Sequence, residues 1–100
     1  MKRTKEYLKL RADAMIRDKG ECAICGRGPR YLNLSHIIPE EITQFNLVLD
    51  NVLMLCPSHH KLGNWSFHKN PIWFAEWLKE HRPNQYQRTI IRLQELENDL

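Results

Sequence analysis

The sequence predicts a small α+β domain that is stabilised by a zinc ion, with one helix before the metal-binding core and two helices after it. The chain has 100 residues, of which 42% are hydrophobic and 27% charged, and this suits one folded domain rather than two. Two pairs of metal-ligand residues, Cys22 with Cys25 and Cys56 with His59, bracket the centre of the chain. Strand-like segments lie between the pairs, and helix-like segments lie outside them.

The N-terminal helix is predicted over residues 4–18. Its apolar residues fall on one stripe at helical spacing: Leu8, Ala12, Met15 and Ile16. Lys19-Gly20 ends this pattern, because glycine commonly follows the last turn of a helix.

The core reads as two short strands followed by a short helix. Tyr31 to Ile38 alternates well enough for a strand, which Pro39 closes. Residues 40–50 form a loop with a short apolar stretch, and Asn51 to Leu55 is the second strand. A helix is expected to start over His59 to Leu62, because Pro57 suits a first turn.

Two helices are predicted at the C-terminal end. Asn70-Pro71 is a good capping and first-turn pair for a helix over 71–80, which Pro83 ends. The final helix covers residues 85–98, and its apolar residues share roughly one face: Tyr86, Ile90, Leu93 and Leu96. This face packs on the core or forms a dimer seam, so a monomer and a homodimer both remain open.

An aromatic cluster near the first of these helices favours core packing. Its members are Trp65, Phe67, Trp73, Phe74 and Trp77. Trp73 and Trp77 are four residues apart, which is the spacing of one buried helix face. The alternative is that these rings stack on nucleic-acid bases.

The cysteines point to a metal site. There are three, so a complete disulfide framework is excluded. Cys22-Ala23-Ile24-Cys25 and Cys56-Pro57-Ser58-His59 each separate two ligands by two residues, which is the spacing that tetrahedral zinc requires. We therefore predict a structural zinc site with Cys22, Cys25, Cys56 and His59 as ligands. A reduced redox CxxC pair is the alternative, and it leaves Cys56 and His59 unexplained.

The charge is distributed unevenly along the chain. The net charge is only +3, but residues 1–30 hold nine Lys/Arg against four acids, and residues 31–60 hold three acids and no Lys/Arg. A basic segment at one end of a small domain is a candidate surface for phosphate contacts. The alternative is an ordinary solvated helix face.

Two classes of protein are excluded by the composition. No apolar run approaches the roughly 18–20 residues of a membrane span, and residues 1–6 lack the apolar region of a secretory signal. We therefore expect an intracellular, cytoplasmic protein with no membrane partner.

Three positions between and beside the metal-ligand pairs carry a family resemblance. They are His36 within Leu34-Ser35-His36-Ile37-Ile38-Pro39, Asn51 after Asp50, and His60 directly after His59. In this order they resemble the signature of the HNH endonucleases, in the zinc-bearing ββα-metal (His-Me finger) subgroup. The stretch after His60 is similar to small phage and prokaryotic HNH proteins, including NinG-like recombination proteins. We expect one domain over residues 1–100 with a core motif over 22–68, and the resemblance implies a phage, viral or prokaryotic source.

The resemblance implies a role for each signature residue. His36 would be the general base, since the pKa of histidine suits the deprotonation of water near neutral pH. Asn51 would brace the loop and orient that base. His60 would hold a catalytic Mg²⁺, Mn²⁺ or Ni²⁺ ion on the scissile phosphate. The zinc ion, with all four positions filled, would then be purely structural.

One position departs from the family pattern. Many members carry Asp just before the base histidine as a second metal ligand, and this chain has Ser35, whose neutral hydroxyl is a poor ligand for Mg²⁺ or Mn²⁺. Candidates to replace the acid are Asn64, which shares a face with His60 if the helix continues, and His68. Their alternative roles are a helix-end cap and a packed imidazole.

Further alternatives concern the basic and histidine residues. His59 could be free and His60 the zinc ligand, but Cys-x-x-His mirrors Cys-x-x-Cys and so the spacing favours His59. Lys61 is either a phosphate contact or a solvated lysine. The other candidate contacts to DNA phosphates are Arg3, Lys5, Lys9, Arg11, Arg27 and Arg30.

The sequence therefore predicts a divalent-metal-dependent DNA endonuclease that hydrolyses phosphodiester bonds. The main alternative is a non-catalytic, zinc-dependent nucleic-acid-binding or recombination-accessory module, and Ser35 keeps it open. A zinc-ribbon adaptor that binds a protein through its aromatic helices is the third hypothesis.

Overall fold

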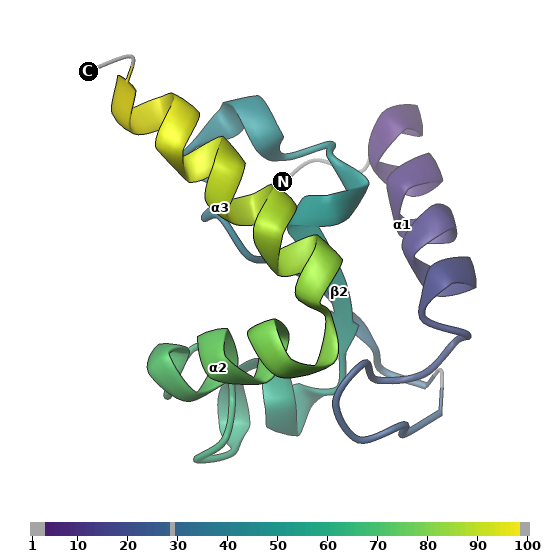
Figure 1. Cartoon of the computed structure of the whole chain (residues 1–100). Helices are drawn as coiled ribbons and strands as arrows, with labels where there is room; N and C mark the ends of the chain where they lie inside the picture. Colours follow the sequence, from purple (N-terminus) through teal and green to yellow (C-terminus); the bar gives the residue numbers. More distant parts are fainter. Residues whose placement is uncertain (1–3, 29, 99–100) are drawn as a thin grey trace.

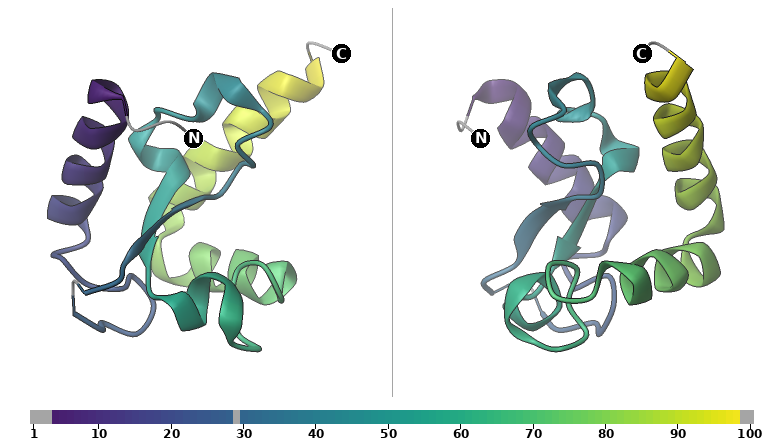
Figure 2. Two further views of the ribbon diagram at one scale, coloured as in Figure 1. Left: turned by 180° about the vertical axis from the view of Figure 1, so that it is seen from behind. Right: turned by 90° about the vertical axis from the view of Figure 1, so that its left-hand side faces the viewer.

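The computed structural model describes residues 4–28 and 30–98 and has three α-helices around a two-stranded antiparallel sheet. The elements are α1 (Lys5–Arg17), β1 (Asn33–His36), β2 (Val52–Leu55), α2 (Pro71–His81) and α3 (Pro83–Asn98). The sheet lies between α1 on one side and α3 on the other, and α2 meets α3 at a sharp corner (Figures 1 and 2). This arrangement confirms the predicted α+β class, with one helix before the sheet and two after it.

Three short helical turns complete the path of the chain. They are η1 (Thr43–Phe45), η2 (Leu49–Asn51) and the π-helical turn η3 (Ser58–Leu62). Since η3 follows β2 after only two residues, β1, β2 and η3 form the predicted ββα unit. The helix expected to start over His59 to Leu62 is therefore present but spans a single turn.

Strand β2 is the centre of the core. All four of its residues, Val52-Leu53-Met54-Leu55, are fully buried, as expected for a continuous apolar strand that is covered on both faces. Leu10 and Ala14 cover it from α1, and Phe74 and Leu78 belong to the same buried cluster from α2.

Strand β1 is shorter than the predicted span of Tyr31 to Ile38. It pairs antiparallel with β2, from Asn33 opposite Leu55 to His36 opposite Val52. Tyr31 has a φ of 68° and so cannot belong to a strand. At Ile38 the side chain of Asn51 binds both the backbone N–H and the C=O. These hydrogen bonds take the place of backbone pairing with β2.

Helix α1 begins and ends as the sequence indicates but buries another face. The Thr4 hydroxyl caps its start by accepting a hydrogen bond from Tyr7 N. After its end, Lys19 and Gly20 both have a positive φ, as is common for residues that follow a helix. The predicted stripe is wrong, because Ile16 is 77% exposed and Leu8 49% exposed. The buried line runs instead through Leu10, Ala14 and the carboxylate of Asp18.

Helices α2 and α3 are separated by Arg82 alone. The Asn70 side chain accepts a hydrogen bond from Trp73 N at the start of α2, as its capping role requires. Pro83 begins α3 rather than only ending α2, since proline suits the first helical position. None of the predicted stripe of α3 is fully buried: Tyr86, Ile90 and Leu96 are half-buried, and Leu93 is 41% exposed. The buried residues of α3 are instead Gln85 and Thr89.

The aromatic cluster packs only in part. Phe74 is buried, and Phe67, Trp73 and Trp77 pack against the core. Trp65 is 59% exposed, so its assignment to the core is wrong. It lies in the loop between η3 and α2 and touches only one side of the aromatic group, with its ring centroid 5.8 Å from that of Trp73.

No helix in the described part of the chain combines the length and the hydrophobicity that a bilayer crossing requires.

Candidate active site and metal centre

The structure brings together the four predicted zinc ligands. Cys22 and Cys25 lie in the loop after α1, Cys56 follows β2 directly, and His59 lies in η3. Their ligand atoms all lie within 4.8 Å of one another. The Cys25 and Cys56 sulfurs are 3.8 Å apart, and His59 Nδ1 is 3.3 Å from Cys56 Sγ and 3.8 Å from Cys22 Sγ.

These separations fit a tetrahedral zinc ion. Bond lengths of about 2.0–2.3 Å from zinc to nitrogen and sulfur give tetrahedral edges of about 3.3–3.8 Å. The donor set of three thiols and one imidazole is a common structural zinc set. None of the three cysteines is in a disulfide. The structure also answers the question of which histidine joins the thiols, because His59 does so and His60 points elsewhere.

Backbone bonds fix the first pair of ligands against the sheet. Cys22 N donates to Arg27 O, Gly26 N donates to Cys22 O, and Ala23 N donates to Met54 O of β2, each at 2.9 Å. Gly26 has a φ of 74°, a conformation that glycine adopts without steric cost. The tight loop between Cys22 and Gly26 is thereby attached to the most buried strand.

The electrostatics favour metal-binding protonation states at Cys22 and His59 but not at Cys25, whose pKa is raised, mainly by burial. Burial raises the pKa of Cys22, but hydrogen bonds from the backbone of Cys25, Cys56 and Ile24 outweigh it, and the pKa lies below its usual value. Burial and the charge of Arg27 lower the pKa of His59. A thiolate and a neutral imidazole are the forms that bind a metal.

His60, next to the fourth ligand, faces His68. Their Nε2 atoms are 3.1 Å apart, and their ring centroids are 4.7 Å apart. The backbone holds them there, because Phe67 N donates to His59 O at 2.8 Å and His68 N donates to His60 O at 3.1 Å. The loop after η3 therefore folds back along the turn that carries His59 and His60.

The separation of the two imidazole nitrogens suits two ligands of one ion. Metal–ligand bonds of about 2.1 Å in octahedral geometry put neighbouring ligand atoms about 3.0 Å apart. Burial, and then the electrostatic influence of the neighbouring His68 and Lys61 side chains, lowers the pKa of His60 to about 4. His60 is therefore neutral at physiological pH and has a lone pair for a metal.

His36 lies at the end of β1 and is buried. Its Nε2 is 2.9 Å from Asn46 O, and since a carbonyl can only accept, Nε2 must carry the proton. Nδ1 is then the atom with the lone pair. It has no hydrogen-bond partner among the described residues, and the nearest charged atom is Glu40 Oε1 at 3.4 Å.

Asn51 is fully buried and binds the loop that follows β1. Its Oδ1 accepts from Ile38 N, and its Nδ2 donates to Ile38 O and to Phe45 O, both at 3.2 Å. It makes no hydrogen bond to His36 in the described part of the chain. Its contacts fix the backbone that leaves His36.

Two residues of the same loop complete the surroundings of His36 and were not singled out by the sequence. Asn46 supplies the carbonyl that accepts from His36, and its side-chain amide donates to Glu40 O at 3.0 Å. Glu40 lies beside the imidazole. The only signal in the sequence was the acidic character of residues 31–60.

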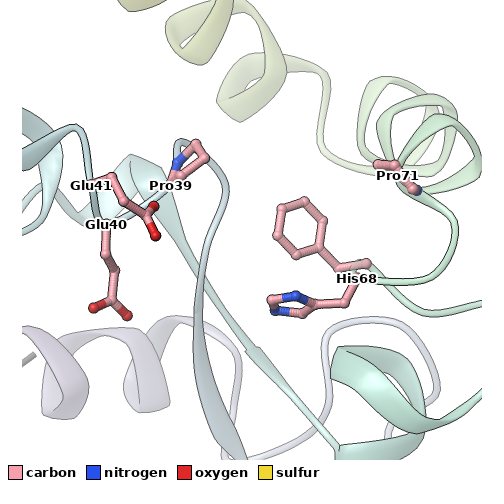
Figure 3. A pocket seen from close by; sticks show the side chains of 6 residues that line it. Pro39, Glu40, Glu41, His68 and Pro71 are labelled. Atoms are coloured by element: carbon pink, nitrogen blue, oxygen red, sulfur yellow. The ribbon is translucent and has the colours of Figure 1, made fainter.

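An open pocket of about 480 Å³ separates this loop from His68. Its lining residues are Pro39, Glu40, Glu41, Phe67, His68 and Pro71. Figure 3 shows the two carboxylates on one wall and the His68 ring on the other, with the ring directed into the space between them. The pocket thus lies between the imidazole of His68, which contacts His60, and the carboxylate next to His36.

The two remaining candidates for the second metal ligand lie apart from this pair. Successive residues of a strand point to opposite faces, so Ser35 occupies the face of β1 opposite to His36. Helix η3 ends at Leu62, and Gly63 is extended, so the condition that would align Asn64 with His60 is not met. No hydrogen bond or ion pair joins Ser35 or Asn64 to His60 in the described residues.

Several of the predicted phosphate contacts have partners within the protein. Lys9 pairs with Asp13 at 2.9 Å, Arg11 donates to Leu32 O, and the Arg30 guanidinium lies 5.2 Å from the Tyr31 ring centroid. Lys5, Arg27 and Lys61 are exposed. Arg3 lies outside the described residues.

Fold and site together define a ββα-metal protein with a cysteine–histidine metal cluster. A protein-family model described as HNH endonuclease matches residues 22–65. The match spans all four cluster residues and the signature positions His36, Asn51 and His60, and the segment 22–65 therefore belongs to the HNH endonuclease family. Members of this family are generally nucleases, and the match therefore points to a nuclease-type function for this segment. Searches of curated proteins and of solved structures gave no match.

Proposed function

We propose that this protein is a divalent-metal-dependent DNA endonuclease that hydrolyses phosphodiester bonds. The observation that carries the proposal is the pairing of His60 with His68, whose Nε2 atoms are 3.1 Å apart, together with the pocket in which His68 lies across from Glu40, the carboxylate beside His36. We further propose that the cysteine–histidine cluster holds zinc and is structural, because four protein ligands leave no open position for water.

His36 is the general base in this proposal. Because Nε2 donates to Asn46 O, Nδ1 takes the proton of a water molecule as that water attacks the phosphorus atom. The bond from phosphorus to the leaving oxygen breaks, that oxygen takes a proton from solvent water, and His36 later releases its proton to solvent. The Glu40 carboxylate, 3.4 Å from Nδ1, stabilises the imidazolium that forms, in the way that a carboxylate supports a catalytic histidine elsewhere.

His60 and His68 hold the catalytic ion in this proposal. When bound, a divalent ion supplies charge neutralisation for the scissile phosphate and the leaving oxygen. Asn51 acts as a positioning residue, since its three hydrogen bonds fix the loop that leaves His36.

One observation favours the non-catalytic alternative. Ser35 stands where relatives of this type carry a metal-binding acid, and it lies on the opposite face of β1 from His36. A nucleic-acid-binding or recombination-accessory module would keep the zinc cluster and the basic N-terminal segment without cleaving.

Plasmid cleavage separates the two functions. Zinc-loaded protein is incubated with supercoiled plasmid and Mg²⁺, Mn²⁺ or Ni²⁺, and His36→Ala and His60→Ala are compared with the wild type. Loss of a general base costs about 10²–10⁴-fold in rate, so we expect His36→Ala to lose at least 100-fold.

The matched control is His81→Ala, which removes an exposed histidine at the end of α2 and should leave the rate unchanged. Cleavage that survives His36→Ala removes His36 as the base. A wild type that binds plasmid but cleaves it with none of the three metals favours the binding module.

A further inference from the structure

The pair of histidines is chemically incomplete as a site for a hard divalent ion. Mg²⁺ and Mn²⁺ prefer charged oxygen donors, and two neutral imidazoles supply none. The family resemblance implies an acid at the position just before His36, but this chain has Ser35 there, on the face of β1 opposite to His36. An anionic oxygen has to come from elsewhere in the fold.

The central third of the chain offers few acids. Residues 31–60 contain Glu40, Glu41 and Asp50. Asp50 is bound to two arginines of α3, at 2.8 Å from Arg88 and 3.6 Å from Arg92. Glu40 lies 3.4 Å from His36 Nδ1. Glu41 is the remaining acid of this segment.

Glu41 is well placed for the missing role. A tight turn, closed by the hydrogen bond from Ile42 N to Pro39 O at 2.9 Å, puts Glu40 and Glu41 at its corner. Both line the pocket whose other wall is His68. In Figure 3 both carboxylates lie on the wall across from His68, and that of Glu41 extends toward the middle of the picture.

We propose that Glu41 is the anionic ligand of the cation held by His60 and His68, and that it replaces the acid missing at position 35. The ligand atoms of these three residues do not all lie within 4.8 Å of one another, so the exposed Glu41 side chain swings across the pocket when the ion binds. The inference rests on the proposed function, since it completes the same cation site.

Manganese binding without DNA tests the assignment directly. Zinc-loaded protein is titrated with Mn²⁺, and the electron paramagnetic resonance signal of free Mn²⁺ gives the dissociation constant. Mn²⁺ does not displace zinc from thiolates, because it lies at the weak end of the affinity order. We expect Glu41→Gln to weaken Mn²⁺ binding at least about tenfold, since even outer-shell partners of a metal contribute about 10–100-fold.

Two comparisons make the result specific. Glu80→Gln neutralises an exposed acid of α2 that is not in the pocket lining, and it should bind Mn²⁺ as the wild type does. His68→Ala should weaken binding as Glu41→Gln does. Wild-type affinity in Glu41→Gln, or loss in Glu40→Gln alone, overturns the assignment of Glu41 and leaves the proposed endonuclease standing. A wild type that binds no Mn²⁺ overturns the metal-dependent function itself.

Discussion

His59 and His60 are consecutive residues that serve different parts of the molecule. Both backbone amides donate to Cys56 O, at 3.1 and 2.9 Å, so the turn of η3 starts immediately after a metal ligand. Neighbouring side chains on a helical turn point about 100° apart. His59 therefore reaches the thiols, and His60 reaches His68.

Gly63 closes this turn, and its lack of a side chain is required. Its N–H donates to Ser58 O at 2.8 Å, and a Cβ at this position would lie 2.7 Å from the same oxygen. We expect Gly63→Ala to lower the free energy of unfolding of the zinc-loaded protein by about 1–3 kcal/mol, the usual cost of overpacking. Urea denaturation followed by circular dichroism measures it.

Gly28→Ala is the control for this substitution. A Cβ at Gly28 would meet nothing within 4 Å, so this variant should unfold at nearly the wild-type urea concentration. Equal midpoints for the two variants would show that η3 tolerates a side chain at its end.

At this scale the sequence predicts the histidines well and their partners poorly. His36 and His60 stand in a recognisable order, and the cysteine spacing identifies His59. Asn46 acts on His36 through its backbone carbonyl. Because every residue has such a carbonyl, the residue type at position 46 does not indicate this contact. Glu40 reaches the site through a turn that does not follow from local spacing. His68 was a candidate from the sequence, but the returning loop that brings it to His60 was not predicted.

The cysteine–histidine cluster joins elements whose own sheet is small. It connects the loop after α1 to the end of β2 and to η3, and β1 and β2 pair over only four residues each. A two-stranded sheet is marginal on its own. We therefore expect the metal-bound cluster to supply stability that a larger sheet would otherwise provide.

Removal of the metal should unfold this part of the molecule. Structural zinc contributes about 10–16 kcal/mol in small zinc domains, so we expect a strong chelator to abolish the cooperative thermal transition seen by circular dichroism. The Trp73 ring lies 6.4 Å from the His59 ring, so tryptophan fluorescence should change at the same chelator concentration.

Added zinc should restore both signals, and Cys25→Ser should behave like the chelated protein at limiting zinc. A metal-free protein with an unchanged melting transition would mean that the cluster is not structural.

Helix ends were predictable from the sequence, and helix faces were not. Thr4 and Asn70 are capping residues, and Pro71 and Pro83 fix first turns, so the bounds of α1 and α2 fall within one residue of the prediction. The buried face of α1 leads to Asp18, whose buried carboxylate pairs with Arg82. Because Arg82 lies far along the chain, the local sequence around α1 gives no sign of this pair. A pattern based on apolar spacing cannot include a buried carboxylate.

Asp18 connects the three layers of the whole molecule. Its carboxylate accepts from Arg17 at the end of α1, from Met54 N in β2 and from Arg82 at the corner of α2 and α3, at 2.9–3.0 Å. Its side chain is fully buried. Burial raises the pKa of Asp18, but these hydrogen bonds and the charges of the two arginines outweigh it and hold the pKa below its ordinary value.

Loss of this carboxylate should destabilise the entire fold. Breaking a buried ion pair by removing one partner costs about 3–5 kcal/mol, so we expect Asp18→Ala to lose that much in urea denaturation. Because the folded pKa is depressed, the contribution of Asp18 is fully present above about pH 5 and is lost as the pH falls below about 4. The difference between wild type and Asp18→Ala should shrink in that window.

Asp13→Ala provides the comparison. Asp13 pairs with Lys9 at the surface of α1, and exposed pairs of this type contribute about 0.3–0.5 kcal/mol. If the two aspartate variants lose similar stability, Asp18 does not join the layers.

The backbone bonds from Phe67 and His68 to His59 and His60 also impose an order on metal loading. The two imidazoles of the cation site face each other only when the turn that carries His59 is in place, and that turn depends on the thiolate cluster. If the proposed zinc and cation sites are correct, zinc is acquired first and the harder ion second. On that proposal, a cell short of zinc would accumulate a chain that magnesium alone does not activate.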